Sequence, residues 1–370
     1  MDMKYLFVLG RNIELSKAEV LTYFEKEKNR ILNYNLIKNG LLIDLENEIS
    51  QKIVDSFGGV VSVGKVLAFG NSKEIQKKLD KINLYSGTKN KLNYVLWNFS
   101  EGYETIQNYL KERFREEKLK ATFKHLTGSI KLQDGETVFI PSSNLIDEEY
   151  FVFGKKEISF GKIISTCDYV SLEKRDMEKP FRRESLAISP RLAKILINLS
   201  YVKNDEILLD PFCGVGTILS EALILGIKVI GIDKDKNAVN GSIENLRWFK
   251  FNSQNYELIN DDSSRAKISG ANVIVTEPDL GETLKKIPPR KIAEETLLRF
   301  ENLIVRVINN FKGKVSGRVV FTSPYIRIGK KRLKCNIEKI VSSTGYKMIY
   351  EIPEYRENQI VGRMIYVLGK

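Results

Sequence analysis

A strand, a glycine-rich turn, a helix and a second strand follow one another between residues 207 and 233, and this order constrains the fold more than any other feature. The first strand is apolar and ends at Asp210, and the second is apolar and ends at Asp233. Between them, Gly214 and Gly216 allow a tight turn whose backbone can approach a ligand closely. The order therefore predicts a nucleotide-binding α/β fold with both acids at the carboxyl edge of a parallel sheet.

The spacing after the turn separates several kinds of nucleotide site. Asp233 follows Gly214 by about the 20 residues expected for a carboxylate that binds ribose hydroxyls. A dinucleotide-binding loop needs a third glycine where Leu219 stands, and a P-loop needs a Gly-Lys-Ser or Gly-Lys-Thr sequence that the segment lacks. A strand-to-helix turn without a ligand is the alternative.

The composition is that of an ordinary globular protein with a basic surplus. The 370 residues suit two domains, or three, and the hydrophobic and charged fractions are 42% and 29%. A net charge of +12 suits a polyanionic partner such as RNA, although a solvated basic surface explains it equally well. One histidine and three scattered cysteines predict neither a disulfide framework nor a metal site.

The sequence also bears on localisation. The chain begins without the basic and apolar run of a signal peptide, and no stretch of 18 apolar residues could cross a membrane. We therefore expect a cytoplasmic protein with no membrane partner. The pattern does not address protein partners or the oligomeric state.

Residues 1–165 predict an N-terminal α+β region. A helix is expected to begin near Ser16, with Ser16 as N-cap and Glu19 completing a capping box. A hairpin is expected around Asn39-Gly40, and a helix over residues 47–57.

Residues 166–188 predict a basic linker between two domains. Ser189 and Pro190 then suit the N-cap and first position of the helix that starts the second domain. The basic side chains of the linker are interpreted as RNA phosphate contacts, with a solvated linker as the alternative: Lys174, Arg175, Lys179, Arg182 and Arg183.

Residues 189–370 alternate apolar strands with amphipathic helices. This order predicts a Rossmann-like domain with a mostly parallel, doubly wound sheet. A helix is expected over residues 330–344, followed by a terminal antiparallel hairpin of residues 346–353 and 360–368.

The turn sequence Asp210-Pro-Phe-Cys-Gly-Val-Gly-Thr resembles the S-adenosylmethionine loop of class I methyltransferases that modify exocyclic amino groups of RNA bases. Further stretches extend the resemblance to the archaeal-type, THUMP-containing tRNA guanosine-10 N2-methyltransferase family. They are Lys174-Arg-Asp-Met-Glu-Lys-Pro-Phe, Ser189-Pro-Arg-Leu-Ala, Gly231-Ile-Asp, Glu244-Asn-Leu and Glu277-Pro. The order of elements in residues 1–165 resembles the THUMP-like RNA-binding half of such enzymes, and a generic α+β domain is the alternative.

The resemblance implies S-adenosylmethionine as cofactor, tRNA or another structured RNA as partner, and no metal. The residues that it places at the cofactor are Asp210, Pro211, Phe212, Cys213, Gly214, Gly216, Thr217, Asp233 and Asp262. Among them, Asp233 would accept from the ribose hydroxyls and Asp262 would meet the adenine amino group, with Asp261 competing. Cys213 is interpreted as a small residue that fills the loop rather than a nucleophile.

The catalytic residues implied by the resemblance follow a later strand, as Glu277, Pro278 and Asp279. Glu277 and the carbonyl of Pro278 would accept hydrogen bonds from the guanine N2 amine. The motif departs from the family where Asp279 and Leu280 replace a proline and an aromatic residue that would stack on the base. Tyr325 or Trp248 could supply that aromatic ring.

The departure keeps other functions open. A DNA or protein-amide amino-methyltransferase would share the acid-proline motif, and a catalytically weakened RNA-binding relative would share the basic charge. The target nucleotide and the choice between mono- and dimethylation are not predicted.

Overall fold

The computed structural model describes residues 3–126, 128–133, 135–140, 145–182, 188–281 and 284–370. The chain divides into two compact units, which are described separately. The first comprises Met1–Lys17, Glu27–Asp55 and Gly59–Cys167. The second comprises Ala18–Lys26, Ser56–Gly58 and Asp168–Lys370. Among the described residues, no helix combines the length and apolar character needed to cross a membrane.

An eight-stranded mixed sheet forms the first unit, in the order β2-β3-β1-β4-β10-β9-β5-β6. Its strands are β1 (Met3–Leu9), β2 (Ile31–Ile37), β3 (Gly40–Leu45), β4 (Val60–Gly70), β5 (Lys91–Ser100), β6 (Lys120–Phe123), β9 (Glu148–Gly154) and β10 (Ile158–Thr166). All neighbours are antiparallel except β5 with β6 and with β9. The strands β7 (Gly128–Lys131) and β8 (Thr137–Ile140) pair separately.

Two helices of this unit, α2 (Ser72–Leu79) and α3 (Tyr103–Glu116), bury apolar side chains against β4, β5 and β9. The expected hairpin around Asn39-Gly40 is confirmed as β2 and β3. The expected helix over residues 47–57 is wrong, since only the short 3-10 helix η1 (Ile53–Ser56) forms there.

Helix α1 (Ile13–Lys26) begins earlier than expected, and the predicted capping box is wrong. The side chain of Asn12, not that of Ser16, accepts from a free amide of the first turn, at 3.1 Å from the nitrogen of Leu15. Glu19 is fully buried within the second unit, where its Oε1 accepts from the Gly58 amide and the Asn198 side chain, each at 2.8 Å. A tertiary contact thus uses the carboxylate that local sequence assigned to capping.

An eight-stranded sheet forms the second unit; seven of its strands follow the order β13-β12-β11-β14-β15-β18-β17, and the eighth, a short strand, pairs with β15 outside this order. These seven strands are β11 (Ile207–Asp210), β12 (Lys228–Asp233), β13 (Tyr256–Asn260), β14 (Val273–Thr276), β15 (Val319–Ile328), β17 (Lys347–Glu354) and β18 (Val361–Gly369). The first five strands in this order are parallel to one another. Strand β18 pairs antiparallel with β15, and β17 pairs antiparallel with β18. The predicted Rossmann-like fold with a terminal antiparallel hairpin is therefore confirmed.

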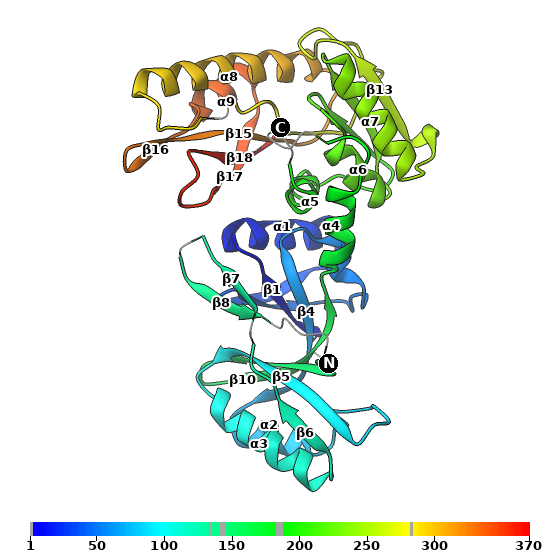
Figure 1. Cartoon of the computed structure of the whole chain (residues 1–370), viewed down its shortest axis with the longest axis vertical. Helices are drawn as coiled ribbons and strands as arrows, with labels where there is room; N and C mark the ends of the chain where they lie inside the picture. Colours follow the sequence, from blue (N-terminus) through cyan, green and yellow to red (C-terminus); the bar gives the residue numbers. More distant parts are fainter. Residues whose placement is uncertain (1–2, 127, 134, 141–144, 183–187, 282–283) are drawn as a thin grey trace. The chain divides into compact units, whose positions relative to one another are not determined.

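Helices cover this sheet on both faces (Figure 1). They are α5 (Pro190–Leu199), α6 (Thr217–Ile224), α7 (Lys236–Trp248), α8 (Arg290–Phe311) and α9 (Ile337–Thr344), and α4 (Tyr169–Met177) packs against α5. The long helix α8 buries one apolar stripe, which includes Leu297, Ile304 and Phe311, against strand residues such as Phe321. Figure 1 shows α8 and α9 on one side of β15 and β18, and α5 on the other.

The second unit departs from the sequence interpretation in two places. The segment expected as a helix over residues 330–344 begins with the short strand β16 (Lys331–Leu333), which pairs with β15, and only α9 is helical. The segment expected as a linker contains α4, capped by the Asp168 side chain at 3.0 Å from the Ser171 nitrogen. The predicted N-cap Ser189 and first-turn Pro190 of α5 are confirmed.

Candidate active site

The glycine turn lies between the end of β11 and the start of α6, at the carboxyl edge of the parallel strands. Gly214 and Gly216 have φ values of 51° and 82°, in the left-handed region that favours glycine. A Cβ on Gly216 would lie 2.4 Å from the Ser242 hydroxyl oxygen, whereas a Cβ on Gly214 would meet no atom within 4 Å. The backbone at Gly214 is therefore open to a ligand, while Gly216 is required for packing against α7.

Asp233 holds the turn in place from the next strand. Its Oδ2 accepts from the Gly214 amide at 2.9 Å, and its Oδ1 accepts from the Asp235 amide at 2.9 Å. A carboxylate offers about four acceptor sites, so each oxygen keeps capacity for a ligand hydroxyl. This arrangement fits the ribose role that the spacing suggested.

Asp210 is a buried carboxyl group at the centre of the edge, with 1% of its surface exposed. Its Oδ1 accepts from the Thr276 hydroxyl at 2.6 Å and from the Phe212 amide at 3.1 Å. Burial raises the pKa of Asp210 to about 7, and the charges of Asp233 and Glu277 act in the same direction. Asp210 therefore orders the turn and the end of β14 from inside the protein.

The other predicted cofactor residues surround this core. Pro211 accepts from the Ser263 hydroxyl, Phe212 packs half-buried against the apolar core, and Cys213 is buried. Burial raises the pKa of the Cys213 thiol well above its ordinary value, which favours the protonated form and a packing role. Asp262 is exposed and accepts from the Ser264 amide at 2.8 Å; this backbone hydrogen bond lowers its pKa.

Glu277 follows β14, and its carboxylate is held by an arginine that sequence reasoning missed. Nε of Arg363, on β18, donates to Oε2, and Nη2 donates to Oε1, both at 2.8 Å. Pro278 is buried, and the exposed Asp279 accepts from the Gly281 amide at 2.9 Å. No local signal marks Arg363, because its partner lies 86 residues away in the sequence.

Asn245, on α7, was assigned no role from the sequence, although it lies in the Glu244-Asn-Leu stretch; its side chain is fully buried. Its Oδ1 accepts from the Phe181 amide at 2.9 Å, and its Nδ2 donates to the carbonyls of Phe181 at 2.9 Å and Val215 at 2.8 Å. A Cβ on Gly241 would lie 2.3 Å from the Phe181 ring, so that glycine makes room for it. Asn245 thus ties the segment around Phe181 to the glycine turn.

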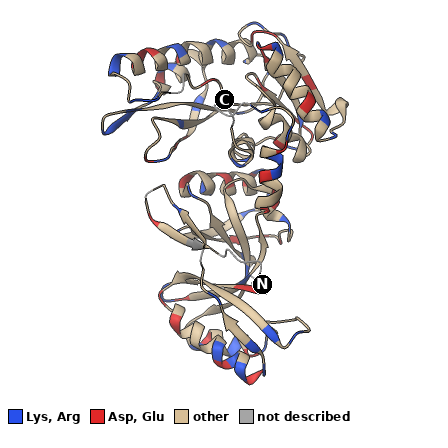
Figure 2. Ribbon diagram, viewed as in Figure 1, with Lys and Arg blue, Asp and Glu red and all other residues tan. Residues whose placement is uncertain are grey.

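The predicted RNA-binding cluster proves heterogeneous. Arg175 forms a two-point ion pair with the buried Glu221, through Nε at 3.0 Å and Nη2 at 3.2 Å. Lys179 is 6% exposed and donates to the Thr217 hydroxyl at 3.1 Å, so its expected contact with an RNA phosphate is corrected to an internal role. Lys174 and Arg182 are exposed, whereas Arg183 lies outside the described residues. Figure 2 shows charges of both signs along α4.

The two candidate aromatic residues occupy different edges. Tyr325 lies on β15 beyond the end of β14, and its ring meets that of Tyr355 at 5.6 Å in an edge-on contact. Trp248 ends α7, which leaves the carboxyl edge after Asp233 and runs back along the sheet, and its ring contacts Phe249 at 4.8 Å. Only Tyr325 therefore shares the edge that carries Glu277.

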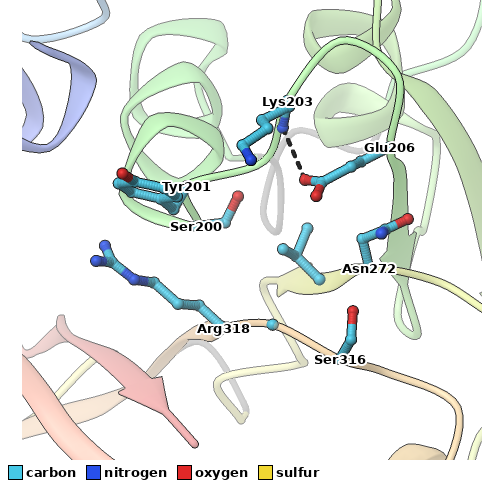
Figure 3. A pocket seen from close by; sticks show the side chains of 9 residues that line it. Ser200, Tyr201, Lys203, Glu206, Asn272, Ser316 and Arg318 are labelled. Atoms are coloured by element: carbon cyan, nitrogen blue, oxygen red, sulfur yellow. Dashed lines mark hydrogen bonds between the residues drawn. The ribbon is translucent and has the colours of Figure 1, made fainter. Parts of the chain in front are cut away.

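A small cavity lies at the opposite, amino edge of the sheet (Figure 3). Its volume is about 130 Å³, and its lining includes Tyr201, Glu206, Asn272 and Arg318. The guanidinium of Arg318 lies 4.8 Å from the centre of the Tyr201 ring and donates to the Leu199 carbonyl at 3.1 Å. Because these residues precede β11, β14 and β15, the cavity is remote from the glycine turn.

Known methyltransferases are similar to this chain in sequence. Residues 179–290 match the family described as RMKL-like, methyltransferase domain. A tRNA (guanine(10)-N2)-dimethyltransferase of Methanothermobacter thermautotrophicus is 36% identical over 30% of this chain and 34% of its own length. The enzyme of the same description from Methanocaldococcus jannaschii is 24% identical over 80% of this chain and 81% of its own length.

Solved structures show the same fold. The crystal structure of TrmN from Thermus thermophilus matches with a TM-score of 0.55 at 12% identity, over 100% of this chain and 99% of its own. A putative methyltransferase complexed with SAH matches with a TM-score of 0.50 at 13% identity, over 99% and 97%. The resemblance at these identities concerns the fold.

Proposed function

We propose that this chain, which carries an RMKL-like methyltransferase domain and resembles the archaeal tRNA guanosine-10 N2-methyltransferases, transfers a methyl group from S-adenosylmethionine to the N2 amine of a guanosine in tRNA. The observation that carries the proposal is the arrangement of three acids, Asp210, Asp233 and Glu277, around a turn that is open at Gly214. The first two order the turn, and the third follows the neighbouring strand.

The residues of the turn fit the cofactor. The open space at Gly214 admits a ligand against the backbone, and Asp233 retains acceptor capacity for ribose hydroxyls. The exposed Asp262 is assigned to the adenine amino group. When bound, the cofactor would supply an electrophilic methyl group on a sulfonium; its C–S bond would break as the N–C bond forms and the sulfur would leave as a neutral thioether, so no protein nucleophile is needed.

Glu277 and the Pro278 carbonyl are assigned to the substrate amine. Acceptors beside the nitrogen stabilise the positive charge that develops on it as its lone pair attacks the methyl carbon. Orientation of the amine contributes roughly 7–11 kcal/mol in favourable cases. Asp279 is assigned to the rim of the same site, and Tyr325 on β15 is the candidate platform for the base.

We assign substrate recognition to the first unit, as a THUMP-like RNA-binding region, and to the exposed Lys174 and Arg182. The net charge of +12 supports an RNA partner, because phosphate contacts dominate such affinity. Cytoplasmic localisation belongs to the same proposal.

The test is incorporation of radiolabelled methyl groups into unmodified tRNA, followed by mass spectrometry of the nucleosides. The expected product is N2-methylated or N2,N2-dimethylated guanosine. Methylation of DNA instead would favour the alternative amino-methyltransferase, and cofactor binding without incorporation into tRNA would contradict the proposal.

A variant sharpens the assignment of the acid. Glu277→Gln is expected to lower kcat by about 100-fold, the loss that misplacement of reacting groups causes, with little change in cofactor affinity measured by calorimetry. Glu257→Gln, an exposed change on β13, is the matched control. A collapse of cofactor affinity in Glu277→Gln would move Glu277 to the cofactor side of the site.

A further inference from the structure

Side chains from two strands, β15 and β18, fix the carboxylate of Glu277, which follows β14. The Thr322 hydroxyl on β15 donates to Oε2 at 3.2 Å, and Arg363 on β18 donates to both oxygens at 2.8 Å. The sheet register explains the approach, because Thr276 pairs with Phe321 and Pro324 pairs with Arg363. The β14, β15 and β18 order therefore brings an arginine to the first acid of the motif.

This contact is the strongest type of charged hydrogen bond available to the acid. Parallel donation by a planar guanidinium fixes both the position and the rotation of a carboxylate. The two side chains are 22% and 7% exposed for Arg363 and Glu277, so water screens the pair weakly. Glu277 consequently has a defined orientation before any substrate arrives.

The donors also limit what Glu277 can accept. Three donors, Thr322 Oγ1 with Nε and Nη2 of Arg363, occupy its oxygens. A carboxylate accepts about four hydrogen bonds, so about one site is left, on Oε1. An incoming amine can therefore donate one N–H to Glu277 while the ion pair stays intact.

Charge at this edge gives the arginine a second effect. The carboxyl groups of Asp210 and Asp233 face the same region, and the charge of Glu277 helps to raise the pKa of Asp210. Burial acts to lower the pKa of Arg363, but its hydrogen bonds and ion pair with Glu277 outweigh burial and raise it. Arg363 thus remains a cation that offsets the concentration of negative charge.

We propose that Arg363 is a positioning residue for methyl transfer, which orients Glu277 and leaves it one acceptor site for the substrate amine. This inference rests on the proposed function. If the ion pair only stabilised the fold, its loss would act independently of the role of Glu277 in methyl transfer. The losses of kcat from Glu277→Gln and Arg363→Gln would then be additive.

The test compares Arg363→Gln, Arg363→Lys, Glu277→Gln and the double variant Glu277→Gln/Arg363→Gln. Arg363→Gln is expected to lower kcat by about 100-fold with nearly unchanged KM for tRNA and unchanged cofactor affinity. Arg363→Lys keeps the charge but loses the two-point contact, so it is expected to recover only part of kcat. In the Glu277→Gln background, loss of Arg363 is expected to cause little further decrease, since residues that act as a unit are not additive.

The control is Arg356→Gln, which removes an exposed arginine from the connection between β17 and β18. Thermal unfolding of every variant checks that the fold is retained. Additive losses in the double variant, or an Arg363→Gln enzyme with the kcat of the wild type, would overturn the positioning role. The proposed function would still stand in that case, provided that the wild-type enzyme methylates tRNA. Absence of methyl transfer by the wild type would remove the proposed function first, and the positioning role with it.

Discussion

Asn245→Ala tests whether one buried amide joins the segment around Phe181 to the glycine turn. The substitution removes three hydrogen bonds, of 2.9, 2.9 and 2.8 Å, to two backbone groups of Phe181 and one of Val215. The substitution leaves the carbonyl of Val215 without the donor Asn245, and both residues are buried.

The magnitude follows from these contacts. Each hydrogen bond contributes about 0.5–1.5 kcal/mol net, which gives roughly 1.5–4.5 kcal/mol for the three. Phe181 is half-buried, so its backbone groups recover part of their hydrogen bonding from water. We therefore expect a loss of about 2–3 kcal/mol in the free energy of local opening. The cofactor should also bind more weakly, because Val215 belongs to the turn.

Hydrogen–deuterium exchange of peptides from α7 and from residues 207–224 measures local opening, and calorimetry measures cofactor affinity. Asn240→Ala is the matched control, since this asparagine is exposed on the same helix and gains the same helix propensity. Equal free energies of local opening in the two variants would refute the reasoning. A lower opening free energy in Asn245→Ala with unchanged cofactor affinity would refute it as well.

Two further predictions concern the turn itself. Burial raises the pKa of Asp210 from its usual value near 4 to about 7, so between these pH values the folded chain binds a proton that the unfolded chain lacks. Stability should therefore fall as pH rises from about 4 to about 7, and Asp210→Asn should reduce this slope in urea unfolding; identical slopes would contradict the burial argument. Gly216→Ala should lower stability by roughly 1–2 kcal/mol, because its φ of 82° strains any side chain and its Cβ would lie 2.4 Å from the Ser242 oxygen. Adding Ser242→Ala should recover part of the lost melting temperature, and no recovery would show that this contact is not the cause.

The sequence predicted elements best where local periodicity and caps agree. The hairpin around Asn39-Gly40 forms as β2 and β3, and Ser189 caps α5 with Pro190 in the first turn, as expected. The capping box at Ser16 and Glu19 was wrong because Glu19 serves contacts distant in sequence. Local propensity cannot register such a use of a side chain.

The candidate site divides in the same way. Asp210, Asp233 and Glu277 could be predicted, since a carboxylate at the end of an apolar strand is a local pattern. Arg363 was not singled out, and Asn245 was named only within a motif without a role, because their contacts are with partners 86 and 64 residues away. Lys179 was misjudged for a related reason: a lysine in a charged segment gives no sign that its ammonium group is buried beside Thr217.

Because residues 18–26 and 56–58 belong to the second unit, a single stretch of the gene does not encode that unit. A gene fragment that encodes only residues 168–370 keeps the buried Asn198 but loses the Glu19 carboxylate and the Ser56 carbonyl that its amide contacts. Recombination that exchanged the early part of the gene would have to restore those same atoms. The second unit is therefore not encoded by residues 168–370 alone, and a substitution at Glu19, Ser56 or Asn198 must be compatible with the other two.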